Sequence, residues 1–184
     1  NFLVNNLHWA SRSISFDNGL NTKILGNLKN INYEAKNIDI YKNDFTSEIY
    51  GALGILSELK LQKLNNNSMH LLTPKALLRF APGSMRKETD GSRLDSSSAF
   101  NVNRLYNENN FETGLTGTFG FDYKIETKNE KEFDFSIAQI ISEKENKKMA
   151  SITSLNEKLS DLVGSTSVKL NENFSLNYNF SLDQ

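Results

Sequence analysis

Histidine and serine are two residue types in this chain whose combination could support nucleophilic catalysis. The two histidines, His8 and His70, lie far apart in the sequence. No serine lies within a Gly-x-Ser-x-Gly turn, which in α/β-hydrolases exposes the nucleophile. We therefore predict no catalytic residue. His8 beside Trp9 is interpreted instead as a pair at a membrane interface, where aromatic side chains gather.

Carboxylates that could bind a metal ion fall in one polar segment. Glu88, Asp90 and Asp95 could hold a hard cation, because Ca²⁺ takes carboxylate and carbonyl oxygens. Arg86 and Arg93 lie among them, so a solvated loop of mixed charge is the other interpretation. The chain has no cysteine, which removes disulfides and thiolate ligands. We predict no metal site and no cofactor.

Lys75 and Arg79 are basic residues within an apolar run. Residues at even spacing on a strand share one face, so both side chains point to the same side. Facing a water-filled lumen, they could attract a phosphorylated glycolipid, or they could pair with Asp or Glu on a neighbouring strand. Pro74 cannot donate a ladder hydrogen bond, so we place it near a strand start or a bulge.

Charge and composition exclude several classes of protein. The 184 residues carry a net charge of −1, so the basic surplus that would neutralise nucleic-acid phosphates is missing and no nucleic-acid partner is predicted. No apolar run approaches the roughly 18 residues of a membrane-spanning helix. Asparagine is frequent inside strand-like runs, although strands usually deplete it, which indicates a sheet with one wet face.

Alternation of apolar and polar residues predicts the secondary structure. From Phe174 to Asp183 the even positions are apolar and the odd positions polar, which is the period of a β-strand. The same pattern predicts further long strands, so that the set is Phe2–Phe16, Thr22–Lys36, Phe45–Leu61, Met69–Ala81, Ser97–Tyr106, Phe111–Glu126, Glu132–Ser142, Leu159–Leu170 and Phe174–Asp183. Several exceed the roughly 9–11 residues needed to cross a bilayer. We predict an all-β antiparallel meander of long strands, forming an open curved sheet that is part of a large outer-membrane barrel.

The two faces of these strands carry the predicted contacts. In a soluble sheet the apolar face turns to a core, whereas in a membrane barrel it turns to lipid and the polar face lines a wet interior. We predict the barrel arrangement. The lipid-facing candidates are Leu115, Phe119, Phe121, Phe174, Leu176, Tyr178 and Phe180. The lumen-facing candidates are Lys75, Arg79, Thr116, Thr118, Asp122, Asn177 and Asn179.

Connections between the predicted strands come in two sizes. Pro82–Asp95 and Glu143–Lys158 are long and polar and are expected to be loops. Tight hairpins are predicted at three segments rich in asparagine and charge, Asn107–Asn110, Thr127–Lys131 and Asn171-Glu172. Short turns alternating with long loops are typical of outer-membrane barrels.

Short pieces in a fixed order carry a family resemblance from about Leu71 onward. They are Leu72–Lys75, Leu78–Arg86, Phe100–Leu105, Phe111–Thr116, Phe133–Ile140 and Leu159–Gly164. This series resembles the barrel domain of the lipopolysaccharide-assembly outer-membrane protein family LptD, also called organic solvent tolerance protein. Residues 1–70 show the alternation without such pieces. We expect residues 1–184 to be one partial barrel segment, with the family-like strands over 71–184.

The resemblance implies the function, location and partners. It implies a large barrel in the bacterial outer membrane that inserts lipopolysaccharide into the outer leaflet, surrounded by outer-membrane lipid. It also implies a plug lipoprotein, LptE, and a periplasmic bridge that docks on an N-terminal β-jellyroll domain. This segment would supply wall and lumen and no catalysis.

Three features depart from the family pattern. No jellyroll domain is visible, cysteine is absent, and the chain ends at Asp183-Gln184 rather than on a terminal aromatic residue. The chain also opens without Met and without a signal peptide. We therefore expect an internal segment of the barrel.

Other functions remain open at this point. Another outer-membrane barrel, such as a porin or passive channel, shares the composition, and only the ordered pieces favour lipopolysaccharide assembly. A soluble β-sandwich binding module would bury the same apolar faces as its core. An outer-membrane phospholipase would need a catalytic His–Ser pair, for which the sequence offers no motif.

Overall fold

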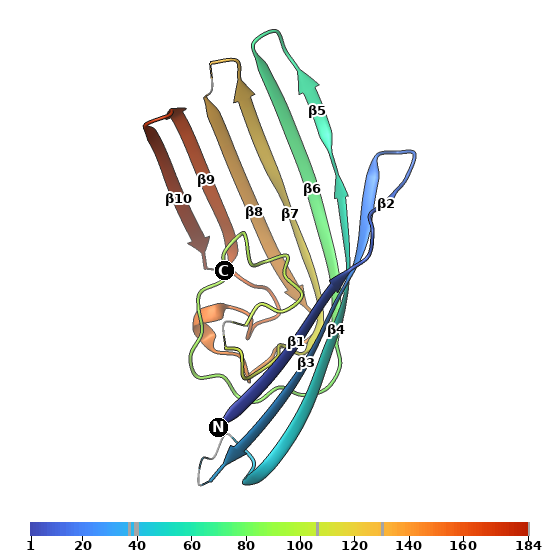
Figure 1. The fold of residues 1–184 in the computed structure, drawn as a ribbon. Helices are drawn as coiled ribbons and strands as arrows, with labels where there is room; N and C mark the ends of the chain where they lie inside the picture. The colour runs from blue at the N-terminus through green and yellow to red at the C-terminus, as the bar shows by residue number, and fades with distance from the viewer. Residues whose placement is uncertain (37, 39–40, 106, 130, 184) are drawn as a thin grey trace.

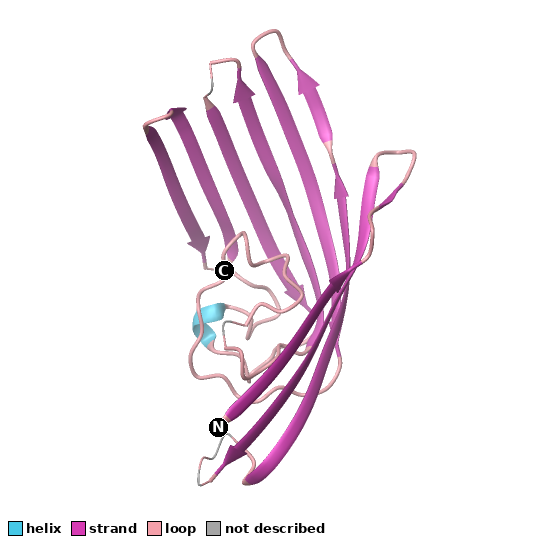
Figure 2. Cartoon of the chain, viewed as in Figure 1, coloured by secondary structure: helices cyan, strands magenta, loops and turns pink. Residues whose placement is uncertain are grey.

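The computed structural model describes residues 1–36, 38, 41–105, 107–129 and 131–183. Within this part of the chain there are ten strands: β1 (Phe2–Ala10), β2 (Ile14–Ser15), β3 (Leu20–Ala35), β4 (Asp44–Leu59), β5 (Leu61–Leu64), β6 (Ser68–Ala81), β7 (Gly114–Thr127), β8 (Glu132–Ser142), β9 (Leu162–Asn171) and β10 (Phe174–Leu182). The helical content of the same residues is one short 3-10 turn, η1 (Ser151–Thr153). Figure 2 shows how completely strands and loops make up the molecule.

All ten strands belong to one antiparallel sheet. Its order is β1-β3-β4-β6-β7-β8-β9-β10, while β2 pairs with β3 and β5 pairs with β6. The sheet curves strongly, and its edge strands β1 and β10 do not pair with each other (Figure 1). The predicted all-β class, the antiparallel meander and the open curved sheet are confirmed.

The predicted strand at Ser97–Tyr106 is wrong. Residues 96–100 form turns, and the segment continues without strand structure to Leu105; Tyr106 lies outside the described residues, as does Glu130 in the predicted 127–131 hairpin. Asp95 explains the turn, because its carboxylate accepts hydrogen bonds from the backbone N–H groups of Ser97 and Ser98, both at 2.8 Å. The predicted hairpin at Asn107–Asn110 is consequently a turn inside a loop.

Two predicted strands are each divided in the structure. Phe2–Phe16 becomes β1 and β2, and Phe45–Leu61 ends as β4 at Leu59 before β5 begins at Leu61. In the register with β6, the interruption between β4 and β5 lies opposite Pro74. Proline has no N–H group to donate to the ladder, which accounts for the break in the partner strand. Pro74 itself lies in the middle of β6, paired with Phe121 in an unbroken register, so its predicted place near a strand start or a bulge is wrong.

Two further strands begin later than predicted. β7 starts at Gly114, whose φ of 123° is accessible to glycine and strained for other residues. β9 starts at Leu162 because Ser160 ends the loop before it: its hydroxyl accepts a hydrogen bond from the backbone N–H of Ile140 at 3.0 Å. Phe111–Thr113 and Leu159–Asp161 therefore belong to loops.

The buried residues lie on the concave side of the sheet. Two loops, residues 82–113 and 143–161, fold back there and form an inner layer, here called the loop layer (Figure 1). One apolar cluster joins Met85, Leu94 and Ala99 of this layer to Ile140 and Val163 of the sheet. A second joins Phe111 to residues of β3, β4 and β6. Phe100 and Leu105 pack against the first cluster and Val102 packs against the second. Apolar residues that point to two sides in this way produce a strand-like pattern in a loop.

Candidate functional site

The connections between strands are unequal at the two ends of the sheet. Short turns close one end, at residues 65–67, 128–131 and 172–173. The long connections 36–43, 82–113 and 143–161 all lie at the other end (Figure 1). The loop layer covers the concave face nearest these long connections, called here the covered half. The rest of that face, toward the short turns, is called the open half.

The centre of the covered half is a buried cluster of three charged residues. Arg79 of β6 is fully buried, and Arg104 and Glu112 of the loop layer are nearly so. Arg104 grips both carboxylate oxygens of Glu112, with its Nε 2.8 Å from Oε2 and its Nη2 on Oε1. Arg79 Nη1 lies 3.5 Å from Oε1 of the same carboxylate.

Neighbouring polar groups complete this cluster. Arg104 donates to the hydroxyls of Thr116 at 3.0 Å and Thr118 at 3.4 Å. Arg79 also donates to the backbone carbonyls of Val102 and Glu112. The contacts tie β6 and β7 to the loop layer at several points. Charged contacts as well as apolar packing therefore hold the loop layer in position on the sheet.

The ionisation of Glu112 follows from its two arginine neighbours. Burial disfavours the charged carboxylate, but Arg104 and Arg79 outweigh burial, so the pKa of Glu112 lies below the ordinary glutamate value of 4.5. Glu112 is thus charged at neutral pH. A buried ion cluster of this kind is strongly destabilised when one partner is removed.

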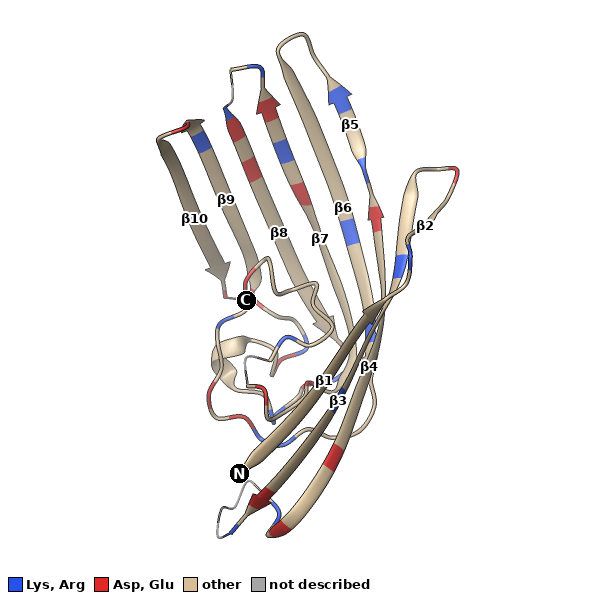
Figure 3. Cartoon of the chain, viewed as in Figure 1, with Lys and Arg blue, Asp and Glu red and all other residues tan. Residues whose placement is uncertain are grey.

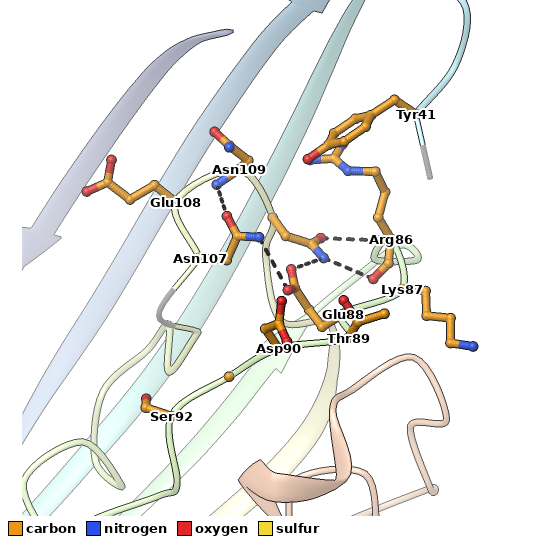
Figure 4. Close-up of a pocket in the computed structure, with 12 residues that line it drawn as sticks. Tyr41, Arg86, Lys87, Glu88, Thr89, Asp90, Ser92, Asn107, Glu108 and Asn109 are labelled. Carbon is orange, nitrogen blue, oxygen red and sulfur yellow. Dashed lines mark hydrogen bonds between the residues drawn. The ribbon is translucent and has the colours of Figure 1, made fainter. Parts of the chain in front are cut away.

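A second set of contacts holds the loop layer against β3 and β4. Arg86 pairs with Glu48 of β4, and its guanidinium lies 5.3 Å from the ring centroid of Tyr33 and 5.0 Å from that of Tyr41. The buried Lys29 of β3 donates to the carbonyls of Glu108 and Asn110, both at 3.1 Å. These residues position a polar cavity at the surface of the layer (Figure 4).

The open half carries ion pairs of a different kind. Lys75 pairs with Asp122, Lys124 with Glu126 at 2.6 Å, and Lys169 with Glu132 at 3.3 Å. These side chains remain partly exposed. Figure 3 shows acidic and basic residues alternating along β7 near the short turns, with acidic residues on β8 and a basic residue on β9.

Lys75 and Arg79 both have acidic partners, while the attraction of a glycolipid to them stays a prediction. Lys75 pairs with Asp122 on the neighbouring strand β7, as the second alternative expected. Arg79 also pairs with an acidic residue, but Glu112 lies in the loop layer rather than on a strand.

The seven lumen-facing candidates share the concave side of the sheet. The register carries one row across it, through Asp122, Ser136, Ser165 and Asn179. Arg79, Thr116 and Thr118 are buried beneath the loop layer, while Asn177 and Asn179 on the edge strand β10 are exposed. The loop layer, which the sequence pattern did not predict, separates the first group from open space.

The seven lipid-facing candidates share the convex side. A parallel row runs through Phe121, Ile137, Gly164 and Phe180. Six candidates are between 36 % and 63 % exposed, and Phe180 is partly exposed. The large apolar side chains exposed on the same face include Ile24, Leu28, Leu53, Ile55, Leu78, Phe80 and Ile141.

Aromatic rings on the convex side form contacts across several strands. Phe121 of β7 lies 5.9 Å from Phe135 of β8, measured between ring centroids, and Phe135 lies 6.3 Å from Phe180 of β10. Tyr178 stacks on Phe180 at 6.2 Å. Cross-strand aromatic pairs stabilise a sheet where its side chains have no core to enter.

His8 and Trp9 lie on opposite faces of β1, so they form no contacting pair, and their position at a membrane interface stays a prediction. Consecutive strand residues point to opposite faces. His8 pairs with Asn27, where its ring nitrogen Nδ1 lies 2.5 Å from the Asn27 amide nitrogen, on the concave side. Trp9 covers Gly26 on the convex side, where a Cβ atom would overlap its indole ring.

His70 and Asp95, which were considered as possible catalytic or metal-binding residues, form hydrogen bonds with nearby side chains and backbone groups. The ring nitrogens of His70 form hydrogen bonds with the Tyr123 hydroxyl at 2.8 Å and the Ser68 hydroxyl at 3.0 Å. Partial burial of Asp95 is outweighed by its hydrogen bonds from Ser97 and Ser98, which leave its pKa below the ordinary value. Among the described residues, no group of three or more His, Cys, Asp or Glu side chains could hold a metal ion.

Sequence reasoning missed Arg104, Glu112, Lys29 and Glu48. Arg104 and Glu112 were read as parts of two strands, yet they meet in a loop eight residues apart. Lys29 and Glu48 meet the loop layer only through the tertiary fold. The sequence did offer one signal for these residues: they are charged side chains at positions that the alternating pattern directs to the concave face.

The fold and these surfaces define a class of protein. An open antiparallel meander with an apolar exposed convex face and a polar or loop-covered concave face is typical of outer-membrane barrel strands. In the part of the chain that the structure describes, no helix is long and apolar enough to span a membrane.

The chain belongs to the LptD family, described as LPS transport system D, which matches residues 31–184. The resemblance inferred from residues 71–184 is confirmed, and the match extends it back to residue 31. No curated protein matches the chain. Membership connects the chain with lipopolysaccharide transport at the outer membrane, in a family of transport and assembly proteins rather than enzymes.

Proposed function

We propose that this chain forms part of the wall of an outer-membrane barrel through which lipopolysaccharide reaches the outer leaflet. Its convex face contacts lipid and its concave face borders the lumen. The observation that carries this proposal is the separation of surfaces: large apolar side chains are exposed on one face, and charged and polar side chains line the other. A soluble sandwich would bury that apolar face.

The height of the apolar band supports a membrane setting. On β7 the outward positions from Leu115 to Tyr123 are apolar or glycine. Eight residue steps extend about 27 Å along a strand, which a tilt of 35–45° reduces to about 20 Å of membrane depth, near the 25 Å of outer-membrane barrels. Strand residues beyond the band extend past the hydrocarbon.

The unequal connections suggest the orientation. Outer-membrane barrels have short periplasmic turns and long extracellular loops, so the loop layer belongs at the extracellular end. A cysteine replacing Lys144 in the full-length protein should react with an impermeant maleimide on intact cells. A cysteine replacing Asn173 should react only after permeabilisation. The reverse pattern would reject this orientation.

Partners are proposed from family membership and from the uncovered surface. The open half of the concave face is hydrophilic and free of the loop layer, which suits the plug lipoprotein LptE. The periplasmic bridge acts before lipopolysaccharide enters the barrel. A photocrosslinker at Asp134 should capture LptE, whereas one at Phe135, on the opposite face, should not. Equal capture from both positions would reject the placement.

The lipid contact has a matched test on two adjacent residues. In the full-length protein in liposomes, single cysteines at Phe121 and Asp122 are labelled with a small fluorophore. Brominated lipids should quench the label at position 121 strongly and the label at 122 weakly. Equal quenching would contradict the wall assignment and favour a sandwich core. Family membership favours lipopolysaccharide over the solutes of a passive channel as the transported molecule.

A further inference from the structure

A cavity of about 760 Å³ opens on the loop layer (Figure 4). It lies between Tyr41 of the β3–β4 connection and two segments of the loop layer, residues 86–92 and 107–110. Its volume falls within the roughly 300–1,000 Å³ of small-molecule sites. If the long loops are extracellular, the cavity lies at the exit of the barrel.

The back of the cavity is rigidly constructed. The buried Asn110 donates from its amide to the Arg86 carbonyl at 2.9 Å and to Glu88 Oε1 at 2.6 Å. Its own oxygen accepts from the N–H groups of Arg86 at 3.2 Å and Phe111 at 2.9 Å. Asn107 donates to the other Glu88 oxygen at 3.3 Å. These bonds fix the two lining segments before any ligand arrives.

Polar groups remain available on this fixed frame. Within the described residues, the side chains of Asp90, Ser92 and Asn109 make no hydrogen bond to the rest of the chain. Arg86 also lines the cavity, but its unpaired Nη2 is buried, so the accessible polar groups are those of Asp90, Ser92 and Asn109. Together these residues offer both donors and acceptors, beside the ring of Tyr41.

The charge of the lining restricts the ligand. The lining carries Arg86 and Lys87 together with Glu88, Asp90 and Glu108, and Arg86 is already paired with Glu48. An anion such as phosphate would meet a surplus of negative charge. A neutral, hydroxyl-rich molecule matches the mixed donors, acceptors and aromatic ring.

We propose that this cavity binds a neutral stretch of the saccharide of lipopolysaccharide during its exit. This inference rests on the proposed transport function. The cavity contacts sugar hydroxyl groups through Asp90, Ser92 and Asn109, and holds the chain weakly enough for it to move on.

The test compares two double variants of the full-length protein in its native outer-membrane complex. Asp90→Ala with Asn109→Ala removes two free cavity groups. Glu172→Ala with Asn173→Ala removes one acid and one amide from the exposed turn between β9 and β10, at the opposite end of the sheet. Within the described part of the chain, none of these four side chains makes a hydrogen bond or an ion pair, and equal melting profiles verify that both variants fold.

The probe is the oligosaccharide released from the lipopolysaccharide of the source bacterium by mild acid, then dephosphorylated. Titration calorimetry should show binding to the wild type, about tenfold weaker binding to the cavity variant, and unchanged binding to the turn variant. Unchanged binding by the cavity variant, an equal loss in both variants, or binding only before dephosphorylation would each overturn the proposal.

Failure of the transport function is detected separately. Cells depleted of their own copy are complemented with the wild type, and lipopolysaccharide at the surface is measured. If surface lipopolysaccharide is restored while the titration fails, the saccharide site is rejected and the transport function stands. If it is not restored, the transport function itself is rejected.

Discussion

The two halves of the concave face share strands β6 and β7 but differ in how far their charged side chains are exposed to water. In the covered half, Arg79, Arg104 and Glu112 are enclosed by the loop layer and nearly inaccessible to water. In the open half, Lys75, Asp122 and their neighbours remain partly exposed. Strand alternation directs polar residues inward in both places. Whether a loop covers them decides how strongly their charges interact, because water screens exposed pairs and not enclosed ones.

The largest difference between the halves should follow from removing one acid in each. Glu112→Ala leaves two buried arginines without their carboxylate and should cost about 3–5 kcal/mol of stability. Asp122→Ala breaks a partly exposed pair and should cost at most about 1 kcal/mol. Thermal unfolding of the full-length protein compares the two. Similar losses would mean that the loop layer does not isolate its charges.

Acid should affect the covered half through Glu112. The folded-state pKa of Glu112 is lowered, so its contribution is fully present above the ordinary value of 4.5 and is lost as pH falls below it toward the folded-state pKa. The stability difference between the wild type and Glu112→Gln should therefore be large at pH 7 and should shrink below pH 4.5. Melting curves at several pH values measure it, and a difference that does not change with pH would contradict this role.

Salt should produce the smallest effect, and only in the open half. Lys124 lies 2.6 Å from Glu126 and 3.4 Å from Glu132 among exposed groups. Lys124→Met should reduce the melting temperature slightly at low salt and not at about 1 M, where the screening length falls to about 3 Å. The loss from Glu112→Ala should persist at both salt concentrations. Equal salt sensitivity of the two variants would remove the distinction between the halves.

The sequence predicted the strands well where each face of the sheet has the same kind of surroundings along the whole strand. β8 and β10 match the predicted runs to within one residue, and β7 matches from Gly114 onward; in β10 apolar and polar residues alternate without interruption. Prediction failed at Ser97–Tyr106, where alternating apolar residues contact two different clusters of the loop layer. An alternating pattern indicates that the two sides of a segment have different surroundings, and it does not indicate whether those surroundings are the faces of a sheet or two clusters in a loop.

Candidate site residues show the same limit. Lys75 and Arg79 were correctly placed on one face, since even spacing determines this. The partner of Arg79 was out of reach, because Glu112 comes from a loop 33 residues away. Nothing in the local sequence around either residue indicates the other.

The sequence alone determined that this chain forms long antiparallel strands with one apolar and one polar face, since side-chain direction alternates with every residue. Only the tertiary structure decided that half of the polar face is enclosed by residues 82–113 and 143–161. Burial depends on contacts between distant segments, and these contacts convert Arg79, Arg104 and Glu112 from surface charges into a buried cluster.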